Sequence, residues 1–369
     1  MTDATRPTDA KRPPDPAAAT DGRDRPLLVG VDVGGSKIAV LVVDHDERIL
    51  ARRVAATAAG APDHAADEIA AVVSQALADA GGKAQQVAAI GVGVPGRVDP
   101  LTGTVTLAVN LGWSDLPLGV RLEERFGRPC VVENDVRAAA LGLHRRGVIG
   151  DIDDLAYLAV GTGVSAGVVL DGRLHRGARG LAGEIGHVIV DPGGAVCACG
   201  QRGCLETLVS GSAIARLARE AIESGRETAL AAPGRSGAAT GNGSPAPTAV
   251  DVYRAAASGD PLATEIADAV GRRLAWAIHL LVMTYDVERV VLGGGVSHAG
   301  ETFERPIQRE LDRMRDASAL AREQLNPDIV ELLPPGADAG AWGAVVIAAA
   351  HAGVGAGRRW EEVGHVRQT

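Results

Sequence analysis

The 369-residue sequence has few aromatic residues, few cysteines and no excess of basic charge. Aromatic residues make up 2% of it, so Ala, Val, Leu and Ile must build any hydrophobic core. The net charge of −9 disfavours a protein that coats nucleic acid. No apolar run approaches the roughly 18 residues of a membrane span, and no signal peptide is visible. We therefore expect a soluble cytoplasmic protein that binds neither nucleic acid nor membranes.

Glycine, by contrast, is abundant, with 48 of the 369 residues. This share is roughly twice the usual one of about 7%. Glycines in such numbers are expected where the backbone turns tightly or where a ligand approaches it closely. The length predicts two domains, or one large unit of two lobes.

The ends and one internal stretch differ in composition from the rest of the chain. Residues 1–26 are rich in proline and charge and predict a disordered tail, which is too short for a DNA-binding winged helix. Residues 226–248 are of low complexity and predict a mobile surface insertion. Two units of strand, glycine turn and strand, at 27–44 and 154–170, form an internal repeat.

Apolar β-type runs alternate with helical segments between these stretches, which is typical of an α/β fold. We expect an N-terminal lobe at 27–136, closed by a C-terminal helix at 339–352, and a C-terminal lobe at 137–338. A cleft would separate the two lobes.

Three glycine turns each follow an apolar strand: Asp32–Lys37, Gly161–Gly163 and Gly293–Gly295. Backbone N–H groups of such turns can bind an anion without a Cβ in the way. An aspartate at a strand end can hold Mg²⁺ through water. Each turn alone is more typical of an ordinary hairpin, but the three together favour nucleotide phosphate. None has the spacing of a Walker loop.

A strand ends and a helix begins at Glu133-Asn134-Asp135. Asp135 is a favoured N-cap residue type, so a capping role is one interpretation. The other is a general base that accepts a hydroxyl proton while the oxygen attacks a phosphate. The N-terminus of the helix would favour the ionised carboxylate.

One histidine and three cysteines match the composition of a closed structural zinc site: His187, Cys197, Cys199 and Cys204. Free thiols and a disulfide are the alternatives. If one ring nitrogen of His187 binds zinc, the other can donate to a sugar hydroxyl, and Glu184 and Glu206 would converge on the same place. Glu206 is alternatively a charge in the first turn of a helix. The fourth cysteine, Cys130, is predicted to be a buried small apolar residue.

Together these motifs, with Gly91–Asp99 and Asn110–Trp113, resemble the ROK family (repressors, open reading frames and sugar kinases) over roughly residues 27–352. The most specific of them are Glu184–His187 and Cys197–Glu206. The resemblance implies a two-lobed, actin-like sugar-kinase fold (ribonuclease-H-like) with an interdomain cleft. It also implies ATP, Mg²⁺ and phosphorylation of a hexose 6-hydroxyl.

The resemblance also implies roles for individual residues. Asp135 is the expected catalytic base. The expected sugar ligands are Asn110, Asn134, Asp135, Glu184, His187 and Glu206. The expected nucleotide-binding residues are Asp32, Gly34, Gly35, Ser36, Lys37, Thr162, Gly163, Gly294 and Gly295. The expected ligands of a structural Zn²⁺ are His187, Cys197, Cys199 and Cys204.

The sequence departs from the family pattern near the cleft. Val136-Arg137 stands where Ala-Asn is usual, Val164-Ser165-Ala166 replaces glycine, and Arg179 stands where Asn is frequent. These departures concern the choice of sugar more than the kinase chemistry.

The leading interpretation is an ATP-dependent glucokinase, a phosphotransferase of glycolysis that acts as a homodimer or homotetramer. The alternatives are a kinase for N-acetylglucosamine, N-acetylmannosamine, mannose or fructose, a sugar-responsive repressor, and a non-catalytic sugar sensor. Polyphosphate is an alternative phosphoryl donor.

Overall fold

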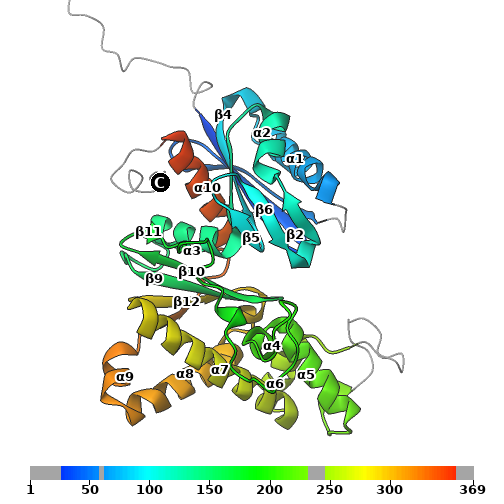
Figure 1. Ribbon diagram of the computed structural model, residues 1–369, viewed down its shortest axis with the longest axis vertical. Helices are drawn as coiled ribbons and strands as arrows, with labels where there is room; N and C mark the ends of the chain where they lie inside the picture. Colours follow the sequence, from blue (N-terminus) through cyan, green and yellow to red (C-terminus); the bar gives the residue numbers. More distant parts are fainter. Residues whose placement is uncertain (1–25, 58–61, 232–245, 355–369) are drawn as a thin grey trace, which may run out of the picture.

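The computed structural model describes residues 26–57, 62–231 and 246–354, which form two lobes stacked along the long axis of the molecule (Figure 1). The predicted tail, except for its last residue, lies outside the described residues. The same holds for the middle of the predicted insertion, 232–245.

The first lobe is built on a five-stranded sheet with the order β3-β2-β1-β4-β8. Its strands are β1 (Leu27–Val33), β2 (Lys37–Val43), β3 (Ile49–Ala56), β4 (Val87–Val94) and β8 (Cys130–Asn134). The first three strands pair antiparallel and form a meander, whereas β4 and β8 run parallel to β1.

Alternate side chains of this sheet face two different layers, as the two-residue period of a strand requires. Val29 and Val31 belong to the core under α1 (Pro62–Asp79) and α2 (Leu118–Phe126). Leu28 faces the opposite side, where it packs with α10 (Ala339–Ala352). Cys130 is buried in the first of these cores, which confirms the prediction for it.

The second lobe repeats the strand order of the first in its sheet β11-β10-β9-β12-β13. Its strands are β9 (Leu155–Val160), β10 (Val164–Leu170), β11 (Arg173–Leu174), β12 (Arg289–Gly293) and β13 (Val330–Leu332). Again three strands pair antiparallel and two follow in parallel. The internal repeat predicted from two strand–turn–strand units is therefore confirmed, and it extends to both whole sheets.

Helices cover the outer face of the second sheet, at the bottom of Figure 1. They are α4 (Glu206–Val209), α5 (Gly211–Glu223), α6 (Ala249–Ala257), α7 (Pro261–Tyr285), α8 (Glu301–Ala317) and α9 (Ala319–Gln324). The residue pattern over Leu205–Ser224 predicts a single helix, but this prediction is wrong, because Ser210 ends α4 and caps α5. Its hydroxyl accepts a hydrogen bond from the N–H of Ala213 at 3.1 Å.

Short elements complete the described chain. A three-stranded sheet consists of β5 (Arg97–Asp99), β6 (Thr104–Ala108) and β7 (Trp113–Leu116). Single 3₁₀ turns are η1 (Ala84–Gln86), η2 (Val109–Leu111), η3 (Ile185–His187), η4 (Ala229–Ala231) and η5 (Gly295–Ala299). Within the described residues, no helix combines the length and the apolar character that crossing a membrane requires.

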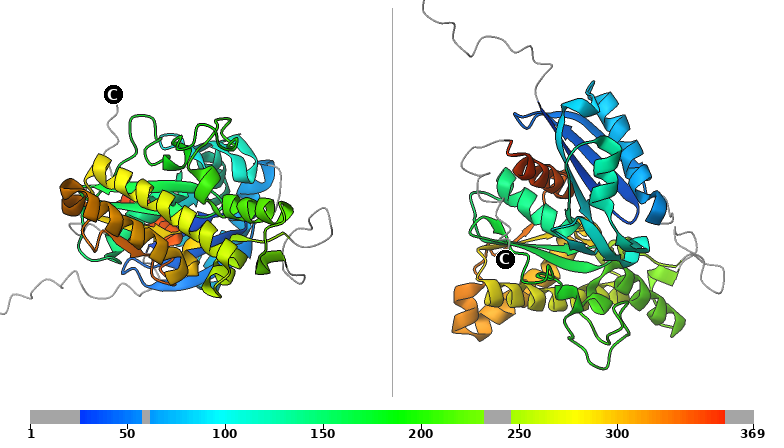
Figure 2. Two further views of the ribbon diagram at one scale, coloured as in Figure 1. Left: turned by 90° about the horizontal axis from the view of Figure 1, so that it is seen from below. Right: turned by 45° about the horizontal axis from the view of Figure 1, so that its top comes forward.

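Two helices cross between the sheets, α10 on the first sheet and α3 (Asp135–Arg146) on the second (Figure 2, right). They touch through backbone: a Cβ on Gly343 would lie 1.9 Å from the carbonyl oxygen of Ala138. A Cβ on Gly142 would lie 2.6 Å from the nitrogen of Gly343. Only glycine permits this approach. The lobe limits 27–136 and 137–338 remain a prediction.

The edges of the predicted insertion are ordered. Arg226 pairs with Glu265 of α7 at 2.6 Å, and Leu230 of η4 is buried in the core of the second lobe. The expectation of a mobile stretch over the whole of 226–248 is therefore wrong at its first residues, where an ion pair and apolar burial hold the chain.

Candidate active site

The carboxyl ends of β1, β4 and β8 meet at one edge of the first sheet, because the three strands are parallel. Asp32 pairs in register with Gly93, and Gly93 with Glu133, so the three residues lie in one row. A Cβ on Gly93 would lie 3.3 Å from the Cα of Asp135. The start of α3 therefore packs directly on this row, and the structure brings the two predicted carboxylates, Asp32 and Asp135, into one site.

Both carboxyl groups are perturbed by their surroundings. Burial raises the pKa of Asp135 to about 7, and the negative charge of Asp32 adds to the shift. Burial also raises the pKa of Asp32 to about 6; Lys37 opposes this shift and Asp338 adds to it. Two carboxyl groups of elevated pKa at strand ends are typical of a catalytic site.

Tyr157 of β9 belongs to this site, although no sequence motif pointed to it. Burial raises the pKa of its hydroxyl, and the charges of Asp32 and Asp135 add to the shift. A Cβ on Gly293 would lie 2.3 Å from the Tyr157 hydroxyl oxygen. The one aromatic residue in the run Leu155–Val160 was the only sequence signal for it, and such residues are usually core.

Asn134, and not Asp135, caps α3. Its side-chain oxygen accepts a hydrogen bond from the N–H of Arg137 at 3.0 Å, and its amide donates to the carbonyl of Gly96 at 3.0 Å. The capping interpretation of Asp135 is therefore wrong. Asp135 is the first residue of the helix and accepts only a local bond, from the N–H of Val136 at 2.9 Å. Its carboxylate keeps capacity for a ligand.

Two of the three predicted phosphate turns lie against each other. The turn Gly161–Gly163 is closed by a hydrogen bond of 2.9 Å from the Gly161 N–H to the Gly163 carbonyl, with Thr162 exposed at its tip. Gly294 has a φ of +86°, and a Cβ there would lie 2.5 Å from the carbonyl oxygen of Val160. Only glycine fits at position 294, because its backbone lies against Val160 at the end of β9, the strand that leads into the Gly161–Gly163 turn.

The first turn stands at the end of β1, next to Asp32. The N–H of Gly34 donates to the carbonyl of Lys37 at 2.8 Å. Gly35, Ser36 and Lys37 are exposed. This turn presents its backbone at the same strand end as the paired carboxylates.

Two glycines press the segment with Glu184 onto β10. Gly183 has a φ of +90°, and a Cβ there would lie 1.8 Å from the carbonyl oxygen of Ala166. A Cβ on Gly186 would lie 2.1 Å from the carbonyl oxygen of Val164. Between them, Glu184 is held close to the helix that carries Asp135. Burial raises the pKa of Glu184, and the charge of Glu206 adds to this.

Glu206 connects the same segment to a phosphate turn. One of its oxygens accepts a hydrogen bond from the N–H of Val164 at 2.9 Å, directly after the Gly161–Gly163 turn. A Cβ on Gly163 would lie 2.6 Å from this oxygen. Glu206 is also the first residue of α4, so its alternative interpretation as a first-turn charge holds alongside this contact.

Asn110, the remaining predicted sugar ligand, lies exposed in the turn η2 of the first lobe. Its role as a sugar ligand stays a prediction.

The predicted metal ligands gather at one point. One side-chain atom each of His187, Cys197, Cys199 and Cys204 lies within 4.8 Å of the other three. The Sγ atoms of Cys199 and Cys204 are 3.6 Å apart, and Cys197 Sγ is 3.7 Å from His187 Nδ1. Ligands about 2.0–2.3 Å from a tetrahedral Zn²⁺ have this spacing, so the four residues fit the ion. His187 Nε2 faces the other way, 3.9 Å from a Glu184 oxygen.

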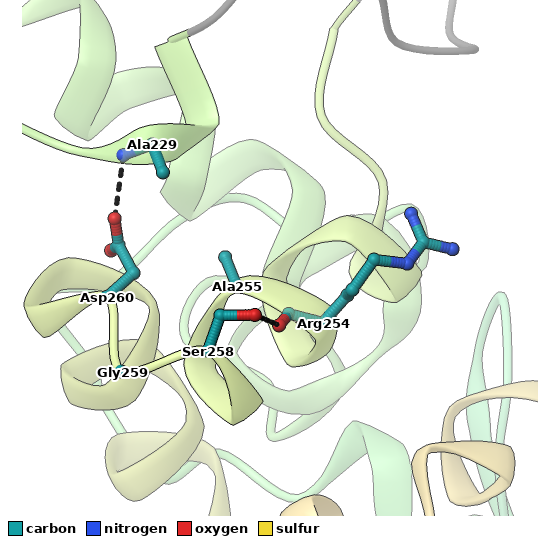
Figure 3. Close-up of a pocket in the computed structure, with 6 residues that line it drawn as sticks. All are labelled: Ala229, Arg254, Ala255, Ser258, Gly259 and Asp260. Atoms are coloured by element: carbon teal, nitrogen blue, oxygen red, sulfur yellow. Dashed lines mark hydrogen bonds between the residues drawn. The ribbon is translucent and has the colours of Figure 1, made fainter.

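A pocket of about 280 Å³ lies elsewhere, between η4 and the helices α6 and α7 (Figure 3). Asp260 in its wall accepts hydrogen bonds from the N–H groups of Ala229 at 2.7 Å and Ala263 at 2.9 Å. This carboxylate caps α7 and joins η4 to it. The pocket contains no predicted site residue, and its acidic group is used by the fold.

Known proteins are similar to this chain over most of its length. The ROK family profile matches residues 28–351. A glucokinase from Halalkalibacterium halodurans is 40% identical over 225 residues, which are 60% of this chain and 66% of that protein. A glucokinase from Streptomyces coelicolor is 32% identical over 290 residues, 78% of this chain and 87% of that protein.

Solved structures and further relatives show the breadth of the likeness. A ROK family glucokinase from Streptomyces griseus, in complex with glucose and AMPPNP, superposes with a TM-score of 0.70 at 34% identity and covers 87% of this chain and 99% of that one. The DNA-binding transcriptional dual regulator NagC of Escherichia coli is 31% identical over 221 residues, 60% of this chain and 52% of that protein. The chain has the two-lobed, actin-like sugar-kinase fold of such structures.

Proposed function

Because the chain belongs to the ROK family, we propose that it is an ATP-dependent hexose kinase that phosphorylates the 6-hydroxyl of glucose. The observation that carries the proposal is Asp135, whose pKa is raised to about 7 at the strand edge that also holds Asp32 and adjoins Glu184. A base with a pKa near 7 is matched to the removal of a hydroxyl proton at neutral pH.

In the proposed reaction Asp135 accepts the proton of the 6-hydroxyl as its oxygen attacks the γ-phosphorus. The backbone N–H groups of the glycine turns orient the phosphates, and phosphoryl transfer requires little else of the protein beyond positioning and charge neutralisation. Asp32 would hold Mg²⁺ through water, and the ion would neutralise charge on the phosphates. Tyr157 fills the space between the carboxylates and Gly293.

On the sugar side, Glu184 and Glu206 supply acceptor oxygens for hydroxyl groups, and His187 Nε2 supplies a donor. His187 Nδ1 and the thiolates of Cys197, Cys199 and Cys204 would hold a structural Zn²⁺, which organises the loop between them. No position remains open in this set for a catalytic water.

Glucose is preferred as the substrate because the cited glucokinases from H. halodurans and S. coelicolor share 40% and 32% of their aligned residues with this chain. An N-acetylmannosamine kinase of Citrobacter koseri, 34% identical over 275 residues (73% of this chain, 84% of that protein), makes N-acetylhexosamines the first alternative. A repressor or a non-catalytic sensor would not need a general base, whereas Asp135 has the pKa of about 7 that suits one.

The proposal is tested by a coupled kinase assay with glucose, mannose, fructose, N-acetylglucosamine and N-acetylmannosamine, each with ATP and with polyphosphate. We expect the highest kcat/KM for glucose with ATP. Activity with an N-acetylhexosamine alone would overturn the glucose assignment, and no activity with any pair would overturn the kinase. Light scattering of the same preparation checks the predicted homodimer or homotetramer.

A further inference from the structure

A buried ion network lies directly beside Asp135. Glu133 at the end of β8 and Arg137 in the first turn of α3 expose only 2% and 3% of their side chains. One oxygen of Glu133 accepts hydrogen bonds from Arg137 Nε and from the N–H of Asn134, both at 2.9 Å. Its other oxygen accepts from Arg176 Nε at 2.6 Å. We call these three charged residues, Glu133, Arg137 and Arg176, the Glu133 network.

The network joins elements of both sheets. Glu133 is the second-last residue of β8 in the first sheet, whereas Arg176 follows β11 of the second sheet. Arg137 Nη1 donates to the carbonyl oxygen of Gly180, in the loop that leads from Arg176 to Glu184. Arg176 belongs to this loop and Arg137 donates to it. Both arginines therefore connect the loop to Glu133, two positions before Asp135.

The loop attached in this way includes the proposed sugar-binding carboxylate. Gly180 has a φ of +66°, and four residues later Glu184 is pressed onto β10 through Gly183. The charge of Arg137 is close enough to act on the carboxyl group of Glu184. Arg137 thus contacts the loop at Gly180, and its charge lowers the pKa of the Glu184 carboxyl group against the effect of burial.

Burying charges such as those of Glu133 and Arg137 is costly unless each is paired and hydrogen-bonded. Here the single carboxylate is shared by two guanidinium groups, and the second nitrogen of Arg137 is satisfied by a carbonyl of the loop. Lysine has one compact ammonium group and lacks the planar fork that reaches two acceptors at once. The geometry therefore depends on arginine at this position.

We infer that Arg137 is a positioning residue for the sugar: together with Glu133 and Arg176 it holds the loop 176–184 so that Glu184 faces the sugar whose 6-hydroxyl Asp135 deprotonates. This inference rests on the proposed function and adds a residue to it. The hydrogen bonds of Arg137 go to Glu133, Asn134 and Gly180, which lie outside the three glycine turns. Its loss should therefore act on the sugar and leave the nucleotide side intact.

The test compares Arg137→Met with Arg137→Lys and with the control Arg289→Met. Arg289 pairs with Glu331 at 2.9 Å on the neighbouring strands β12 and β13, so it is an ion pair of the same bond length, more exposed and outside the site. Each variant is assayed for kcat, for the KM of glucose and of ATP, and for its melting temperature.

We expect Arg137→Met to raise the KM of glucose by about tenfold or more, the effect of one charge-assisted hydrogen bond. The KM of ATP should change by less than about twofold, because the hydrogen bond lost with Arg137 acts only on the sugar side. Arg137→Lys should lie between wild type and Arg137→Met, and Arg289→Met should change neither KM. A double-mutant cycle with Glu184→Gln should be non-additive in the KM of glucose, because both changes act on one contact.

Equal changes in the two KM values, or an unchanged KM of glucose, would overturn the inference. If Arg137→Met does not fold, Arg176→Met is measured in its place, because this side chain is 26% exposed. A wild-type protein that phosphorylates no sugar overturns the proposed function, whereas an active wild type with a silent Arg137→Met overturns the inference alone.

Discussion

Replacing Asp135 with asparagine is expected to abolish turnover and, at the same time, to stabilise the fold. The folded protein holds a proton on this carboxyl group up to a pH of about 7, whereas the ordinary pKa of an aspartate in an unfolded chain is 3.8. Between these two values the folded state binds more protons than the unfolded state. The free energy of unfolding of the wild type therefore falls as the pH rises through this range. The side-chain amide of the Asp135→Asn variant is neutral at every pH and avoids this loss.

The size of the effect follows from the shift. A change from 3.8 to about 7 corresponds to about 4 kcal/mol, at about 1.4 kcal/mol per pKa unit. Part of the shift comes from the charge of Asp32, and Asp32 has its own raised pKa, so the two groups share the titration. We expect about 2 kcal/mol of added stability at pH 8, or about 4 °C in melting temperature, and none below a pH of about 4.

The assay pairs kinase activity with denaturant unfolding at pH 5, 6, 7 and 8. Asp135→Asn should retain less than about 1% of kcat, as expected for loss of a general base, and should gain stability only as the pH rises. Asp260→Ala is the control of opposite sign. Burial tends to raise the pKa of Asp260, but hydrogen bonds from Ala263 and Ala229 hold it below its usual value. This variant should lose about 1 kcal/mol at pH 7.

Retained turnover in Asp135→Asn would refute the role of the base. A variant that keeps the wild-type pH dependence of stability would refute the buried, proton-holding carboxyl group. The two readouts are independent, so either part of the reasoning can fail alone.

Three further outcomes are expected. The kcat/KM of the wild type should rise with pH to a plateau with an apparent pKa near 7, measured at saturating ATP, because Asp135 must lose its proton; a flat profile from pH 5 to 8 would contradict this. Cys204→Ser should lower the zinc content, measured by metal analysis, from about one ion per chain. Cys130→Ala should leave the zinc content unchanged, because Cys130 does not belong to the cluster of possible metal ligands and Cys204 does. Gly183→Ala should lower stability by more than about 2 kcal/mol in denaturant unfolding and raise the KM of glucose, whereas Gly193→Ala, which meets only ordinary contacts, should do neither.

Much of the fold could be predicted from local pattern. The strands at 27–33 and 155–160, the helix from Pro62 and the helix from Ala339 follow from apolar periodicity and from the proline and glycine residues that bound them. The apolar pattern continues on both sides of Ser210 and does not predict the break there. The extended backbone of Ser210 separates α4 from α5, and its hydroxyl accepts a hydrogen bond from the N–H of Ala213.

The candidate site was predictable where residues of one motif are close in sequence. The cysteine cluster is the best example, since Cys197, Cys199 and Cys204 lie within eight positions and meet His187 in space. Tyr157 and Arg176 could not be found in this way. Each lies in a segment without a motif, and each reaches the site only through the packing of the second sheet against α3.

The sequence by itself determined the residue types of the chemistry: the glycine turns, the carboxylate at Asp135, the acceptor oxygens of Glu184 and Glu206, and the family to which they belong. Only the tertiary structure decided which of these groups meet. It placed Asp32 beside Asp135, raised the pKa of both by burial, and made Arg137 part of a buried ion network. The reason is that desolvation and Coulomb interaction depend on distances between elements far apart in the chain, which a linear pattern does not contain.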